Sequence, residues 1–178
     1  MTAVYKECIP NVKNKIIKHS GSIVYGWQLW KHSFMIEAEF HSIWKSPKGM
    51  LIDITPKQFR TDYIIFIEDS KTPYNGKQIA NIMINTTRND LVDDFIELNQ
   101  ARFRIENKDE RATINDEITL SGQEAELYNL INTLISHTKR MILLGSTKES
   151  ECFCGKGSKY KDCHGQNLME DLKKYIKL

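Results

Sequence analysis

Four residues of the types that bind zinc are concentrated near the C-terminus. A Cys-x-Cys pair is followed, after an eight-residue spacer, by an adjacent Cys-His pair. Zinc takes four thiolate or imidazole ligands in a tetrahedron, and three cysteines with one histidine make a common closed structural site. The other interpretation is three unrelated thiols and a surface histidine. We expect Zn²⁺ to be bound by Cys152, Cys154, Cys163 and His164.

Residues 152–165 resemble the SEC-C motif, a small zinc-binding module found at the C-terminus of the translocase ATPase SecA and of many other bacterial proteins. The cysteine spacing, the spacer glycines, Tyr160-Lys161 and the final Cys-His-Gly match the motif, whereas Phe153 and Lys156 replace its usual proline and serine. The resemblance implies recruitment to a protein partner or the ribosome. The surrounding lysines suit contact with phosphates or an acidic protein, or only solvation: Lys148, Lys156, Lys159 and Lys161.

Zinc accounts for three of the four cysteines and leaves Cys8 to be explained. Pro10 suits the first turn of a helix and Gly21 suits its exit, so a helix is predicted to begin near Cys8. The helix dipole favours a thiolate at that end. A thiolate beside a histidine and a carboxylate is the arrangement needed for nucleophilic attack on a carbonyl carbon.

His41 and Asp53 lie in consecutive predicted strands, 34–45 and 50–55, on either side of the sequence Ser-Pro-Lys-Gly. Proline and glycine at these positions favour a three-residue hairpin loop with a glycine bulge. That loop places Ser46 opposite Met50, and the two functional residues become diagonal neighbours on one face. A two-residue loop would place them on opposite faces.

The first third of the chain then resembles the transglutaminase-like, papain-related cysteine enzymes. The matching order is Cys8, a strand, His41 near an aromatic residue, and Asp53 before Thr-Pro. The tryptophan follows the histidine by three residues, where the family commonly has His-x-Trp, and no run of small residues surrounds Cys8. The resemblance implies a cysteine peptidase, deamidase or transglutaminase-like hydrolase in which Cys8 is the nucleophile, His41 the general base and acid, and Asp53 the orienting group.

Simpler interpretations of the same residues stay open. A lone cysteine can be a small buried apolar residue, a strand histidine can be structural, and Asp53 can satisfy a turn. Glu37 and Glu39 are alternative acids near the histidine. The second functional hypothesis is therefore a non-catalytic adaptor that binds a protein or the ribosome through the zinc module.

Composition limits the class of protein. The chain has 178 residues, of which 40% are apolar and 27% charged, as in globular domains. The net charge of +2 does not indicate nucleic-acid binding, and no sequence-specific DNA binding is expected. The start of the chain has no signal-type apolar run, and no segment is as long as a membrane span. With cysteines at zinc spacing, we expect a cytoplasmic protein that does not enter membranes.

Periodicity predicts an α+β fold, in which an antiparallel sheet of papain- or transglutaminase-like type packs with helices and a small zinc knuckle follows. Residues 1–147 are expected to form the globular domain and 148–178 the SEC-C-like module with a terminal helix. Loss of the metal is expected to unfold residues 150–165 and spare the rest. The remaining predicted elements are strands at 22–30 and 62–68, the latter covered, and helices at 89–107 and 121–144, the last opened by a capping box.

Overall fold

The structure is a computed structural model that describes residues 3–59, 61–72, 74–113, 118–168, 170 and 172. Its α-helices are α1 (Cys8–His19), α2 (Leu91–Glu106) and α3 (Gly122–Leu143), and short 3-10 turns follow at Asp109–Thr113 and Tyr160–Asp162. The strands are β1 (Ser22–Lys31), β2 (Met35–Lys45), β3 (Leu51–Ile52), β4 (Ile65–Glu68) and β5 (Ile82–Asn85).

The strands form one sheet in the order β3-β2-β1-β4, and β5 also pairs with β2. The β1–β4 and β2–β3 pairs are antiparallel. The α+β class with an antiparallel sheet is therefore confirmed.

The chain divides into two compact units, and the short segment at the start of β2 belongs to the second unit. The first comprises residues 1–31 and 37–82, and the second comprises residues 32–36 and 83–178. The boundary predicted after residue 147 falls inside the second unit.

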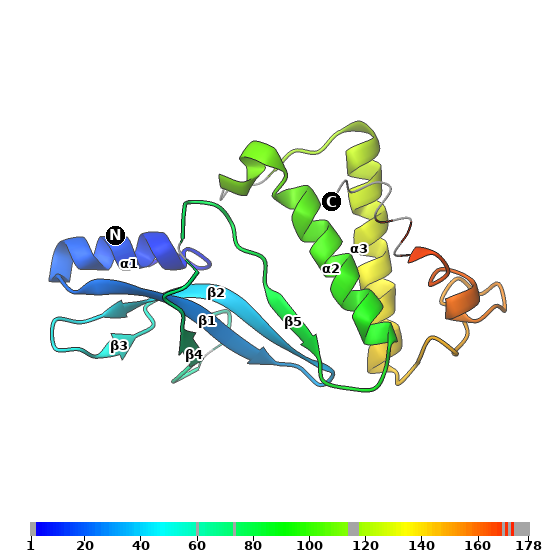
Figure 1. Cartoon of the computed structure of the whole chain (residues 1–178), viewed down its shortest axis with the longest axis horizontal. Helices are drawn as coiled ribbons and strands as arrows, with labels where there is room; N and C mark the ends of the chain where they lie inside the picture. The colour runs from blue at the N-terminus through cyan, green and yellow to red at the C-terminus, as the bar shows by residue number, and fades with distance from the viewer. Residues whose placement is uncertain are drawn as a thin grey trace. The chain divides into compact units, whose positions relative to one another are not determined.

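In the first unit, helix α1 lies alongside β1 (Figure 1). Val12 is fully buried and Ile9 nearly so, which gives the helix its inward face. At its far end the Trp44 indole donates a hydrogen bond to the carbonyl of Ser20, 2.9 Å away. Gly21 follows with a φ of +93°, and a Cβ there would collide with the Trp44 ring and the Lys45 carbonyl. This glycine is required because the helix exit approaches β2 so closely.

The predicted hairpin register is confirmed. Trp44 pairs with Ile52, and the Ser46 N–H donates to the Met50 carbonyl at 2.9 Å. Gly49 has a φ of +82°, as the bulge position of a three-residue loop requires. Strand β3 is shorter than predicted, because only Leu51–Ile52 pair with β2 before the chain turns toward Asp53.

The structure differs from the predictions for the two later strands, β4 and β5. The apolar run 62–68 was predicted to be covered, but β4 exposes Ile65 and Ile67 by 59% and 52%. The two residues lie two positions apart and therefore on one face of β4, and this face is exposed. Strand β5 was not predicted, since its four residues are too few to show a clear alternation.

The second unit is built on the helix pair α2 and α3, which lie side by side (Figure 1). Leu91, Leu98 and Ile131 are fully buried between elements of this unit. Both helices match the predicted ranges closely. The predicted capping box is not formed. The Ser121 side chain makes no cap hydrogen bond, and the Glu124 carboxylate instead accepts hydrogen bonds of 2.9 and 2.7 Å from Arg111.

Most of the predicted terminal helix lies outside the described residues. Among the helices that are described, none combines the length and the apolar character that crossing a bilayer requires.

Candidate active site and metal centre

Cys8 is the first residue of α1, as predicted, with Glu7 as the N-cap residue. The segment before it is fixed by the buried side chain of Asn11, whose amide bonds both backbone groups of Val4 at 2.8 and 2.7 Å. The Cys8 thiol is partly buried at a helix N-terminus, where the backbone N–H groups and the dipole favour negative charge.

His41 and Asp53 are in direct contact. His41 Nε2 lies 3.1 Å from Asp53 Oδ1, and their side chains are only 4% and 11% exposed. An ionised carboxylate accepts hydrogen bonds and cannot donate them, so Nε2 carries the proton in this bond. The other ring nitrogen, Nδ1, takes no part in the contact with Asp53.

Cys8 and His41 perturb each other in the way a thiolate–imidazolium pair does. Burial alone would raise the pKa of the Cys8 thiol, but hydrogen bonding to His41 and the charge of the imidazole outweigh it, and the pKa is lowered. Burial alone would lower the pKa of His41, but hydrogen bonds to Asp53 and Cys8 and their negative charges raise it to about 9. Both shifts act in the direction that favours the thiolate–imidazolium pair over the neutral thiol and imidazole.

Besides His41, two groups of the following turn hold the Asp53 carboxylate. Burial would raise its pKa, but bonds from His41, Lys57 and the Thr55 N–H lower it to about 2. The Thr55 N–H lies 3.0 Å from Oδ1, and Lys57 Nζ lies 2.7 Å from Oδ2. Asp53 is therefore ionised at every pH at which a cysteine enzyme would work.

The alternative acids are engaged elsewhere. Glu39 accepts a bond of 2.8 Å from the Trp30 indole, and Glu37 accepts one of 2.7 Å from the Asn81 amide. Within the part of the chain that the structure describes, the carboxylate that pairs with His41 is that of Asp53.

Three residues of this site, Lys57, Gln28 and Ser42, were missed from the sequence. Gln28 on β1 is only 2% exposed, and its Oε1 accepts a bond of 2.7 Å from Lys57 Nζ. The fully buried Ser42 lies near the thiol, and its side chain and backbone act to lower the Cys8 pKa. A polar Gln28 inside an otherwise apolar strand was the one available signal, because a buried amide requires a partner.

Aromatic rings lie close to the thiol on the same unit. Phe40, next to His41 in the chain, stacks on Tyr25 and Tyr74 with centroid distances of 5.9 and 6.3 Å. Burial first, and then the negative charges of neighbouring groups that include Cys8, raise the pKa of both tyrosines. Both tyrosines are therefore neutral at physiological pH, and the rings add apolar surface near Cys8 without adding charge.

In the second unit the four predicted ligands come together. The ligand atoms of Cys152, Cys154, Cys163 and His164 all lie within 4.8 Å of one another. Cys152 Sγ and Cys163 Sγ lie 3.1 and 3.4 Å from His164 Nδ1, and the Cys154 and Cys163 sulfurs lie 3.6 Å apart. Four soft or borderline donors at these separations could hold a metal ion.

A short backbone turn presents the first two ligands. The Cys152 N–H donates to the Ser158 carbonyl at 2.8 Å, which closes a loop over the spacer. A hydrogen bond from the Lys156 backbone lowers the pKa of Cys154 and favours the thiolate form that binds metals. At the other end Gly165 packs so tightly on Tyr160 that a Cβ would lie 2.5 Å from its ring.

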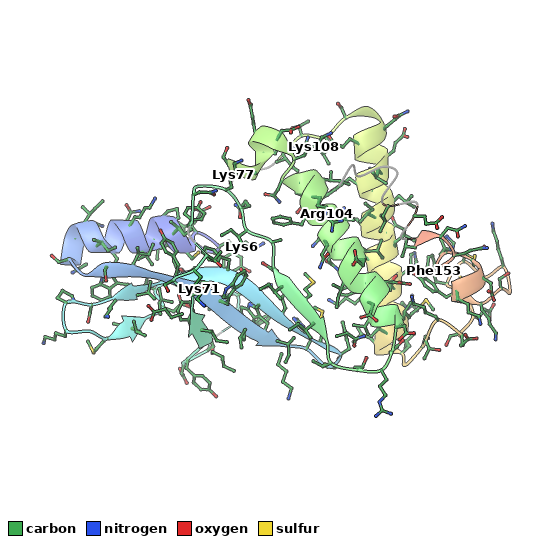
Figure 2. All side chains as sticks on the ribbon, viewed as in Figure 1. Lys6, Lys71, Lys77, Arg104, Lys108 and Phe153 are labelled. Carbon is green, nitrogen blue, oxygen red and sulfur yellow. The ribbon has the colours of Figure 1, made fainter. Side chains whose placement is uncertain are left out.

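The knuckle, defined here as residues 150–165, is part of the core of the second unit. The Phe153 ring, labelled in Figure 2, stacks on the His137 ring of α3 with a centroid distance of 4.4 Å. It also packs at a tilt against the His164 ring, with a centroid distance of 4.5 Å. Tyr160 is fully buried and, with Cys152, belongs to the apolar cluster of α2 and α3. The metal ligands therefore sit on the folded body of this unit.

Most lysines around the knuckle have acidic partners. Lys148 pairs with the buried Asp94 at 2.8 Å, and Lys159 and Lys161 pair with Glu149 at 2.9 and 2.7 Å. These pairs reduce the positive charge that the knuckle would offer to phosphate groups.

Comparison of the chain with protein-family models, with curated proteins and with solved structures finds no match.

Proposed function

We propose that the protein is a cysteine hydrolase or amide-transfer enzyme with a Cys8–His41–Asp53 site, and that its C-terminal knuckle binds zinc. The observation that carries the first part is the chain of contacts from a carboxylate of pKa about 2 to a histidine of pKa about 9 and on to a thiol of lowered pKa. Nucleophile, base and orienting acid in this order are what acyl transfer through a thiolate requires.

In the proposed reaction the Cys8 thiolate attacks the carbonyl carbon of an amide. The imidazolium of His41 gives its Nδ1 proton to the departing nitrogen, the C–N bond breaks, and a thioester forms on Cys8. Water or an amine then gives a proton back to Nδ1 and attacks the thioester, which releases the acid or the new amide and restores the ion pair. Asp53 accepts the Nε2–H bond throughout and keeps the ring oriented.

The order of these residues along the chain supports a transglutaminase-like, papain-related core. A helix that starts with the nucleophile, a strand that carries the histidine and a turn that carries the acid are the matching parts. A peptidase, a deamidase and a transferase all need this arrangement, so the second nucleophile, water or amine, distinguishes them.

The proposal of zinc rests on donor chemistry and spacing. Thiolates about 2.3 Å from a tetrahedral zinc ion lie about 3.8 Å apart, and a thiolate and an imidazole nitrogen lie about 3.5 Å apart. The observed S···S distance of 3.6 Å and S···N distances of 3.1 and 3.4 Å are close to these values. Bound zinc would stabilise the knuckle, and no step of the reaction needs it. This supports a module of the SEC-C type.

Alkylation of Cys8 tests the enzyme proposal. Iodoacetamide should label Cys8 at mildly acidic pH faster than it labels the denatured chain, because the thiolate persists below its usual pKa of about 8.5. His41→Ala should slow the labelling, whereas His19→Ala, which changes a histidine at the other end of α1, should not. Zinc should protect the other cysteines, so mass analysis can assign the site.

If native Cys8 resists alkylation from about pH 5 to about pH 8 and His41→Ala changes nothing, the enzyme proposal is wrong. The non-catalytic adaptor then becomes the better account of the same fold.

Recruitment through the knuckle is a separate proposal, with a protein partner or the ribosome as target. Because Lys148, Lys159 and Lys161 are ion-paired, a protein partner is favoured over phosphates. Leu143 and Leu144, at the end of α3 before the knuckle, are 61% and 73% exposed and add apolar surface. Co-sedimentation with ribosomes that persists at moderate salt and is lost on Leu144→Asp would instead favour the ribosome.

A further inference from the structure

Lys57 joins two parts of the first unit that lie far apart in the chain. Its ammonium group lies 2.7 Å from Asp53 Oδ2 and donates to Gln28 Oε1, also 2.7 Å away. The Lys57 side chain is 16% exposed and Gln28 is 2% exposed, so neither bond competes freely with water. A lysine buried to this extent requires partners, and these two supply them.

The bonds of Lys57 decide how the Asp53 carboxylate can turn. Oδ1 receives the His41 Nε2–H and the Thr55 N–H, while Oδ2 faces Lys57. Rotation of the carboxylate would separate this ion pair, because Gln28 holds the ammonium group in place from β1. Without Lys57, Oδ2 would be left as a buried charged oxygen, which favours rotation toward solvent or uptake of a proton.

We propose that Lys57 is a positioning residue of this site, which keeps Asp53 ionised and turned so that Oδ1 faces His41, and which thereby keeps Nδ1 directed at the Cys8 thiol. The inference rests on the proposed function, because it assigns Lys57 a role in the same site. Lys57 is then a fourth functional residue beside Cys8, His41 and Asp53. The buried Gln28 holds the Lys57 ammonium group in place through its hydrogen bond.

The titratable groups near the thiol–imidazole pair come from several elements of the first unit. From the turn after β3, Asp53 contacts His41 and Lys57 contacts Asp53. Tyr25, Tyr74 and Glu7 are the further titratable groups that interact electrostatically with Cys8 or with its tyrosine neighbours. Tyr25 and Tyr74 have raised pKa values, chiefly through burial, and do not titrate in the range tested. A shift caused by Lys57→Met can therefore be assigned to the charged network.

The test is the pH profile of Cys8 alkylation in the full chain. Lys57→Met, which keeps the length of the side chain and removes its charge and donors, should slow labelling at mildly acidic pH about tenfold, as expected when the apparent pKa rises by about one. Lys57→Arg keeps charge and donors and should restore the rate to within about threefold of the native rate. Lys48→Met, at an exposed lysine of the hairpin loop, controls for loss of one positive charge.

A double substitution distinguishes positioning from general stabilisation. If Lys57 acts through Asp53, then Lys57→Met should add nothing to the effect of Asp53→Asn. A full additional loss in the double variant, or a native profile in Lys57→Met, would overturn the proposal. Far-UV circular dichroism of each variant shows whether it has folded. If Lys57→Met does not fold, the labelling rate of Lys57→Arg tests the proposal instead.

Titration of the His41 ring nitrogens by NMR separates this inference from the proposed function. If native Cys8 proves unreactive, the enzyme proposal fails. The role of Lys57 is then tested only by the pKa of His41, measured from its ring nitrogens. A drop in the His41 pKa in Lys57→Met, with recovery in Lys57→Arg, supports positioning even then. An unchanged His41 pKa in Lys57→Met beside a reactive native Cys8 would reject the role of Lys57 and leave the enzyme proposal intact.

Discussion

His41 Nε2 lies 3.1 Å from Asp53 Oδ1, across a hairpin whose loop type alone places the two residues on one face. The contact sets which imidazole nitrogen is free, and so it determines which atom can exchange a proton with Cys8. The same bond is the most direct point at which the proposed chemistry can be altered without changing the shape of the site.

Asp53→Asn should lower the pKa of His41 from about 9 toward its ordinary value. The amide has nearly the shape of the carboxylate, but it carries no charge to stabilise the imidazolium. NMR titration of the ring nitrogens measures the change, and Glu39→Gln is the matched control, because Glu39 bonds Trp30 rather than His41. An unchanged His41 pKa would show that the Asp53 contact is not formed in solution.

The stability of the first unit should fall as the pH is lowered from about 4 to about 2. The pKa of Asp53 is about 2 in the folded chain against an ordinary 3.8. The unfolded chain therefore binds more protons in this range, and acid favours unfolding, by at most about 2 kcal/mol for this group. Urea unfolding at a series of pH values measures the loss, which should be smaller in Asp53→Asn.

Gly49→Val should destabilise the first unit by about 1–2 kcal/mol, because Gly49 has a φ of +82° and a β-branched residue is strained there. The space around a Cβ at this position is open, so the cost is one of backbone conformation and not of collision. Lys48→Val, at the preceding loop position, is the control. Equal unfolding midpoints for the two variants would contradict the assigned loop type.

Removal of the metal should destabilise the whole second unit and leave the first unit folded. The sequence alone suggested that only residues 150–165 would unfold, but Cys152 and Tyr160 belong to the same buried cluster as α2 and α3. Loss of the ion leaves the thiolates unpaired and loosens that cluster. Hydrogen exchange after chelation should therefore rise in α3 as well as in the knuckle, while β1 and β2 keep their protection.

Purified protein without about one zinc ion per chain would contradict the zinc assignment.

Phe153→Ala should weaken metal retention as well as stability. The Phe153 ring lies between His137, on which it stacks, and the ligand His164, against which it is tilted, so its loss removes a packing contact of the ligand ring. We expect a loss of about 1–3 kcal/mol in unfolding free energy, in the range of core truncations, and faster release of zinc to a colorimetric chelator. Phe153→Leu should recover part of the stability, and a release rate equal to that of the native chain would show that the stack does not support the ligand.

The local features of this protein could be predicted from sequence because they depend on residues a few positions apart. The spacing of three cysteines and one histidine predicted a cluster that the structure brings within 4.8 Å. Proline and glycine in one loop predicted the hairpin register, and with it the His41–Asp53 contact. Helix ends, strand alternation and turn chemistry are likewise set by neighbours in the chain.

The remaining features required the tertiary structure. The meeting of Cys8 with His41 depends on how α1 packs on the sheet, and no pattern in the chain encodes that packing. Lys57 and Gln28 lie 29 positions apart in the chain, and only the folding of the turn after β3 onto β1 makes them partners. The burial of Tyr160 likewise follows from the packing of the knuckle on α2 and α3. Contacts between distant segments are selected by shape and burial over the whole unit, so only the folded chain determines them.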